Sequence, residues 1–81
     1  MNNSIINSDV KVYESNDQLN IIAQTGEEIQ EVEVYSLNGA CVFKSNTKGN
    51  VFNAKLNLSA AMYLVRVKTS ISTQNIKVSW E

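Results

Sequence analysis

Hydrophobic and polar residues alternate through most of the chain, and no apolar stretch repeats at helical spacing for more than one turn. Because successive side chains of a strand point to opposite faces of a sheet, this period of two predicts half-buried β-strands. The clearest case is 51–58, in which four apolar residues share the inward face: Phe52, Ala54, Leu56 and Leu58. Strands are predicted at 10–15, 18–24, 29–37, 40–45, 51–58, 62–70 and 73–80.

Short polar stretches separate these segments, and they read as turns. Asn38-Gly39 is the strongest hairpin signal and predicts a type I′ turn, in which both central residues need a positive φ. Asn16-Asp17 and residues 46–50 also favour turns. Short strands that recur roughly every 8–12 residues with brief turns between them are typical of an antiparallel sandwich or barrel. The pattern therefore predicts an all-β domain of seven antiparallel strands.

The last predicted strand runs almost to the final residue, Glu81. Ile76, Val78 and Trp80 share one phase of this strand, and we expect them to supply core that a small domain cannot spare. Removing this segment should therefore unfold the protein. Residues 9–81 are expected to form the domain, while residues 1–8, rich in Asn and Ser, are expected to be a disordered lead-in or the end of a linker.

Composition limits the function classes. The chain has 81 residues and a net charge of −1, and its seven cations are spread along the sequence, so we expect no binding to nucleic acid. No stretch approaches the roughly 18 apolar residues of a membrane span. The single cysteine, Cys41, excludes a disulfide within the chain, and core or half-buried packing is its expected role.

Catalytic chemistry finds little support. The chain has no histidine, so a Ser/His/Asp or Cys/His arrangement cannot form within it. The carboxylates are interpreted as an acidic turn at Glu27-Glu28 and a solvated strand face at Glu31 and Glu33, with calcium held by Glu27, Glu28 and Asp17 as an open alternative. We expect a non-enzyme with no cofactor and no metal site.

The aromatic residues divide into two groups. Phe52, Tyr63 and Trp80 lie in the inward phase of their strands, and we expect them in the core. Tyr13 and Tyr35 are out of phase with Val12 and Val34, and they are predicted to form a small exposed aromatic patch. Either a bound carbohydrate or cross-strand pairing would account for such a patch.

Three segments in order resemble a known family. VEVYSLNGACVFKS, LNLSAAMYLVRVKTS and TQNIKVSW resemble the hairpin, the tyrosine-containing segment and the closing strand of the C-terminal sorting domains of the type IX (Por) secretion system. VKVYESNDQLNII matches the family's opening strand more loosely, so the resemblance covers roughly residues 10–80. Lys77 corresponds to the family's near-terminal lysine.

The resemblance implies a fold and a function. It implies a seven-stranded antiparallel Ig-like β-sandwich at the C-terminus of a cargo protein that crosses the periplasm and then reaches the cell surface or the medium. The implied partners are the outer-membrane secretion machinery, a sortase-like peptidase and an upstream cargo domain in the same chain. The implied recognition residues lie on the last strand, the Asn-Gly hairpin and the tyrosine segment: Lys77, Val78, Ser79, Trp80, Glu81, Asn38, Gly39 and Tyr63. An Ig-like accessory or adhesion module, with or without carbohydrate binding, is the alternative.

Overall fold

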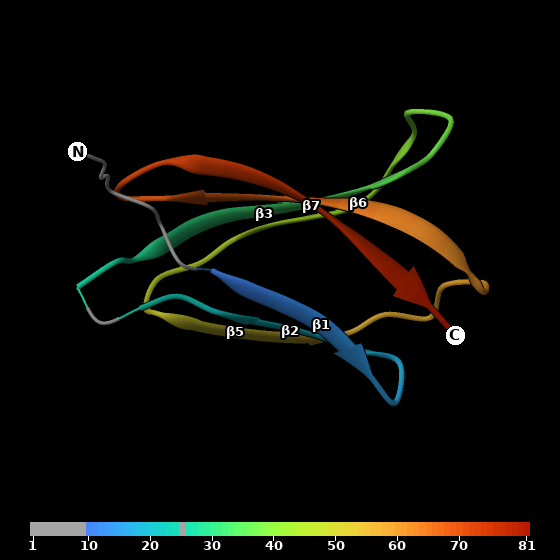
Figure 1. Ribbon diagram of the computed structural model, residues 1–81, viewed down its shortest axis with the longest axis horizontal. Coiled ribbons are helices and arrows are strands. Elements are labelled where there is room, and N and C mark those ends of the chain that lie inside the picture. Colours follow the sequence, from blue (N-terminus) through green and yellow to red (C-terminus); the bar gives the residue numbers. More distant parts are fainter. Residues whose placement is uncertain (1–9, 25) are drawn as a thin grey trace, which may run out of the picture.

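The computed structural model describes residues 10–24 and 26–81, and within these residues it contains only β-strands and their connections (Figure 1). The predicted lead-in at 1–8 lies outside the described residues. The all-β prediction is confirmed, and each predicted strand is present with bounds that differ by at most three residues from the prediction. The strands are β1 (Lys11–Ser15), β2 (Gln18–Ile22), β3 (Ile29–Ser36), β4 (Cys41–Asn46), β5 (Val51–Lys55), β6 (Ala61–Thr69) and β7 (Thr73–Trp80).

The strands form two antiparallel sheets packed face to face. One sheet has the order β1-β2-β5, and the other has the order β4-β3-β6-β7 (Figure 1). β5 joins the first sheet and β6 the second, so the chain crosses between the layers at residues 56–60. A three-stranded and a four-stranded antiparallel sheet with such crossings make an Ig-like sandwich. The predicted fold class is confirmed.

The core lies between the two sheets, and its buried strand residues come from β2, β3, β6 and β7. The central strands β2, β3 and β6 contribute most of it, because each is covered by a neighbour on both sides. Full burial of one such aliphatic side chain contributes about 1.5–3 kcal/mol to folding. The buried hydrophobic residues are Leu19, Ile21, Ala23, Ile29, Val32, Val34, Leu56, Tyr63, Val65, Val67, Val78 and Trp80.

The sandwich has two ends that differ in what they contain. The end that we call the carboxyl end holds the β1–β2 turn, the β3–β4 loop, the 56–60 crossing and the end of β7 (Figure 1). The opposite end, called the amino end, holds the start of β1 and the loops that connect β2 to β3, β4 to β5 and β6 to β7 (Figure 1). The residues predicted to function in recognition belong to the carboxyl end.

The type I′ turn lies at a different hairpin from the one predicted. Asn16 and Asp17 have φ values of 54° and 62°, and they directly connect the paired residues Ser15 and Gln18. At the predicted site only Gly39 has a positive φ, and the amide of Gly39 donates to the Ser36 carbonyl at 2.9 Å. A four-residue connection closed by a glycine in this conformation accompanies a register shift between Val34 and Tyr35. The Asn38-Gly39 hairpin is thus confirmed, but its type I′ geometry is wrong because the connection is longer than two residues.

Tyr63 fastens the crossing between the sheets. Its hydroxyl donates to the carbonyl oxygen of Ser59, four residues upstream, at 2.9 Å, and its ring is buried. Tyr63 lies near the start of β6. A tyrosine at this place whose hydroxyl bonds back to the backbone a few residues upstream is a hallmark of Ig-like sandwiches and is called the tyrosine corner. Tyr63 therefore holds the 56–60 segment against the start of β6, which gives this predicted recognition residue a structural role.

Glu27 corrects the prediction of a solvated acidic turn. Its side chain is buried at the amino end, and its Oε2 accepts a hydrogen bond from Thr69 Oγ1 at 2.6 Å. The same threonine oxygen accepts bonds from the amides of Ile71 and Ser72, each at 3.1 Å. The hydrogen bond from the Thr69 hydroxyl replaces part of the water that the buried Glu27 carboxylate loses. Glu27 therefore connects the β2–β3 loop to the β6–β7 turn.

The tyrosine corner gives the first testable prediction. Tyr63→Phe keeps the ring but removes the bond to the Ser59 carbonyl, so the free energy of unfolding should fall by about 1–2 kcal/mol. Urea denaturation followed by the fluorescence of Trp80, the single tryptophan, measures this change. Tyr13→Phe is the matched control, since that ring is 47% exposed and should unfold like the parent. Equal midpoints for the two variants would contradict a fastening role for Tyr63.

Candidate recognition surface

The register of the four-stranded sheet brings most of the predicted recognition residues together at the carboxyl end. Tyr63 pairs with Ser36 on one side and with Val78 on the other, and the next rung pairs Met62 with Ser79. The loop that contains Asn38 and Gly39 begins directly after Ser36. Residues more than 35 positions apart in the sequence are therefore neighbours on one end of one sheet.

Strand alternation divides the predicted residues into a buried set and an exposed set. Val78 and Trp80 lie in the core, and the Trp80 ring meets Tyr63 edge-to-face with centroids 6.3 Å apart and planes at 82°. The indole N–H has no hydrogen-bond acceptor within residues 10–24 and 26–81, so apolar contacts carry its burial. A partner that binds the folded domain cannot reach these side chains.

Lys77, Ser79 and Glu81 are exposed, and Lys77 and Ser79 face outward from the four-stranded sheet. Their register partners Leu64 and Met62 face outward beside them, and Tyr35 follows on β3 opposite Leu64. Met62 is 41% exposed, and Leu37 at the tip of the neighbouring hairpin is 68% exposed. We call Tyr35, Met62, Leu64, Lys77 and Ser79 the outer patch. It is the exposed surface that the predicted residues help to form.

β7 also presents backbone. It is an edge strand, paired with β6 along one side from Thr73 to Trp80. Its other edge has no hydrogen-bonded strand partner among the described residues, although β1 of the other sheet lies nearby. An edge of this kind carries unpaired N–H and C=O groups that an extended segment can join. The geometry of β7 is therefore compatible with the addition of a partner strand along residues 75–81.

Asn38 and Gly39 act within their own loop. Asn38 Oδ1 accepts from the amide of Ala40 at 3.2 Å and from the hydroxyl of Ser36. Gly39 has a φ of 93°, a conformation that side-chain-bearing residues rarely adopt. Both residues are exposed, and their contacts shape the hairpin tip that carries Leu37.

A charged cluster borders the outer patch. Glu33 accepts from the Tyr35 hydroxyl at 2.8 Å and lies 3.5 Å from Lys44 Nζ. The Tyr35 hydrogen bond is the main cause that lowers the pKa of Glu33 below its ordinary value of 4.5, with Lys44 and Arg66 adding to it. The same bond raises the pKa of Tyr35 above 10.0. The predicted solvated position of Glu33 is wrong, because these neighbours leave it only 8% exposed.

Two further expectations are overturned. Cys41 is exposed, since it pairs with Tyr35 on the outer face of the edge strand β4 and not with the core. Tyr13 pairs with Asn20 on the three-stranded sheet, whereas Tyr35 belongs to the four-stranded sheet. The two tyrosines therefore lie on opposite outer faces and form no common patch. The reason for expecting a carbohydrate to bind at Tyr13 and Tyr35 is thereby removed.

The acids weighed as a calcium site do not meet. Asp17 belongs to the turn before β2, at the carboxyl end, whereas Glu27 and Glu28 follow β2 at the amino end. In the described part of the chain, no three acidic or thiol side chains gather as a metal-ion site would require. The alternative of a calcium ion held by Glu27, Glu28 and Asp17 together is therefore wrong.

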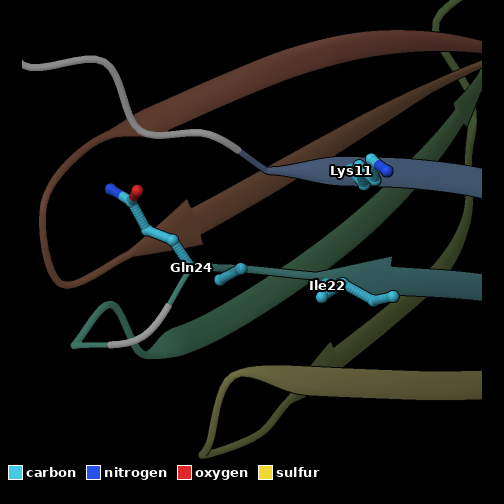
Figure 2. Close-up of a pocket in the computed structure, with 4 residues that line it drawn as sticks. Lys11, Ile22 and Gln24 are labelled. Carbon is cyan, nitrogen blue, oxygen red and sulfur yellow. The ribbon is translucent and has the colours of Figure 1, made fainter.

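A shallow cavity of about 320 Å³ lies at the amino end of the three-stranded sheet. Lys11, Ile22, Ala23 and Gln24 line it, from the start of β1 and the end of β2 (Figure 2). This lining brings together one ammonium and one carboxamide with two apolar side chains and no carboxylate. The cavity is remote from the outer patch and contains no residue predicted to function.

Arg66 and Lys68 belong to the tyrosine segment that resembles the family, but the sequence pattern assigned neither residue an individual role. They occupy alternate positions on β6, so both face outward with Leu64, and Lys77 joins them from β7. The alternation of residues along β6 is enough to place Arg66 and Lys68 on one face. The register between β6 and β7 is needed to place Lys77 on the same face.

The Glu33 cluster predicts a pH dependence. A carboxylate whose pKa is lowered by folding stabilises the folded state above its unfolded pKa, and this contribution is lost as the pH falls through the folded pKa. Glu33→Gln should therefore unfold at a lower urea concentration than the parent at pH 7, and the difference should shrink below about pH 4.5. Glu28→Gln, an exposed acid at the amino end, is the charge-matched control. A difference that stays constant between pH 7 and pH 3 would contradict the assignment.

Trp80 is buried and its neighbour Ser79 is exposed, so substitutions at these two positions test the two sides of β7 separately. Trp80→Ala should cost about 3–5 kcal/mol, a large part of the roughly 5–10 kcal/mol that stabilises a small domain. The melting temperature by circular dichroism should fall sharply or the transition should vanish. Ser79→Ala, the exposed neighbour, should stay within about 0.5 kcal/mol of the parent. A Trp80→Ala variant with an unchanged melting temperature would show that the ring is not part of the core.

No helix that could cross a membrane is found among the described residues. Comparison with curated proteins finds no match to this chain. A family model described as the secretion system C-terminal sorting domain matches residues 15–80, which include all of β2 to β7. The chain therefore belongs to the type IX secretion system C-terminal sorting domain family.

Proposed function

We propose that the domain is a non-catalytic targeting module, which directs a cargo protein joined ahead of it through the type IX secretion machinery. The observation that carries this proposal is the family match over residues 15–80. A family of sorting signals implies interaction with that machinery and export to the cell surface or the medium. The cargo, its passage through the periplasm and its later processing are the finer parts of the proposal.

Recognition would use the exposed features of the carboxyl end. Lys77, Ser79 and Glu81 provide side chains, the open edge of β7 provides backbone groups, and the Asn38-Gly39 hairpin lies on the same end. Tyr63, Val78 and Trp80 would act indirectly, because their buried side chains hold β7 in place. A rigid strand loses little conformational entropy on binding, which favours recognition of the folded domain.

In this scheme the domain performs no chemistry itself. A sortase-like peptidase at the cell surface would separate it from the cargo after transport. The absence of histidine from the sequence removes the commonest general base. The cavity lined by Lys11, Ile22, Ala23 and Gln24 brings no carboxylate, hydroxyl or thiol to its walls.

Export of a reporter tests the proposal. Residues 1–81 fused behind a periplasmic reporter should carry it to the cell surface or the medium in a type IX-competent host. The same fusion should remain periplasmic in a strain that lacks the outer-membrane channel of this system. Trp80→Ala should abolish export by unfolding the domain, whereas Tyr13→Phe should not change it. Retention of the parent fusion in the competent host would refute the proposal.

A further inference from the structure

The outward positions of β6 and β7 carry three cations and no acid. Arg66 and Lys68 face outward from β6, and Lys77 faces outward from β7 beside Leu64. All three are exposed, although the whole chain has a net charge of −1. The positive charge is therefore concentrated on one face of a protein that is acidic overall.

Among the described residues, these three cations form no ion pair. Over residues 10–24 and 26–81 the ion pair that forms is Lys44 with Glu33, and Lys44 belongs to β4. Arg66 lies opposite Glu33 and contributes to its lowered pKa, but Glu33 already accepts from Tyr35 and contacts Lys44. Glu31 on β3 is the register partner of Lys68, although the two form no ion pair within the described residues. This face presents four cations, Lys44, Arg66, Lys68 and Lys77, against the two acids Glu31 and Glu33, so its net positive charge favours an anionic partner.

Apolar side chains continue this basic face toward the carboxyl end. Met62 and Leu64 precede Arg66 on β6 at alternate positions, and Tyr35 lies opposite Leu64. Methionine, aromatic residues and arginine are enriched at protein–protein interfaces relative to other surfaces. A phosphate-rich polymer would gain from the cations alone, whereas a protein would also cover Met62. The combination favours a protein partner.

We propose that the outer face of β6 and β7 docks an acidic protein surface whose carboxylates meet Arg66, Lys68 and Lys77 and whose apolar centre covers Met62 and Leu64. The proposal rests on the proposed function, because it assigns that surface to the secretion machinery. It adds a side-chain interface to the strand edge of β7. Complementary charge then sets the rate and orientation of docking, while the apolar centre supplies the buried area.

Cys41 provides a built-in probe for this face. It is exposed, it is the only cysteine, and it pairs with Tyr35, which lies opposite Leu64. The purified chain, residues 1–81, would be labelled there with a benzophenone maleimide and irradiated with detergent-solubilised outer membranes of a type IX-competent host. A Cys41→Ser/Ser15→Cys chain carries the same label on the other sheet. Protein adducts should form from Cys41 and be at least about tenfold weaker from position 15.

Charge removal decides the proposal. Arg66→Gln/Lys68→Gln/Lys77→Gln should lower the yield of the Cys41 adduct at least about tenfold. Lys11→Gln/Lys48→Gln/Lys55→Gln removes the same charge from other surfaces and should change the yield less than about twofold. Trp80 fluorescence verifies that each variant is folded. Equal yields for the two variants, adducts with lipopolysaccharide in place of protein, or no charge-dependent adduct would each overturn the proposal.

The reporter fusion separates this result from the proposed function. If the parent fusion is exported and the Arg66/Lys68/Lys77 variant is exported equally well, the docking face is wrong while the targeting function stands. If the parent fusion is retained in the periplasm of the competent host, the targeting function itself is wrong.

Discussion

The contact between Tyr63 and Trp80 is the interaction on which the carboxyl end of the sandwich depends. Tyr63 bonds back to Ser59 and so fixes the crossing between the sheets, while its ring packs edge-to-face against Trp80. Such an aromatic pair contributes about 0.5–1.5 kcal/mol beyond the area that it buries. One pair of rings therefore couples the path of the chain between layers to the docking of the last strand.

This coupling explains why recognition and stability are difficult to separate in β7. The strand gives alternate residues to the core and to the solvent, so Val78 and Trp80 support the backbone on which Lys77 and Ser79 are displayed. A substitution on the buried side acts through the fold, and one on the exposed side acts through the partner. A residue's phase in the strand decides which of the two effects an export assay reports.

The sequence predicted the strands and their buried faces well, because a period of two translates directly into alternation across a sheet. It failed where the outcome depends on which segments meet. Glu27 reads as part of a polar turn, yet its carboxylate is buried because Thr69, 42 positions away, lies beside it. Tyr13 and Tyr35 share the same phase in the sequence but belong to different sheets. The register shift at Val34 and Tyr35, which places Cys41 on the outer face, has no local signal either.

The strand directions have a mechanical consequence. β1 runs from the amino end to the carboxyl end, and β7 in the other sheet runs the same way (Figure 1). A tension between the start of β1 and the end of β7 therefore pulls each strand along its own axis and loads all its hydrogen bonds at once. A pull directed sideways on the free edge of β7 instead opens the pairs with β6 one after another. The domain thus resists stretching along its length and yields to peeling from its last strand.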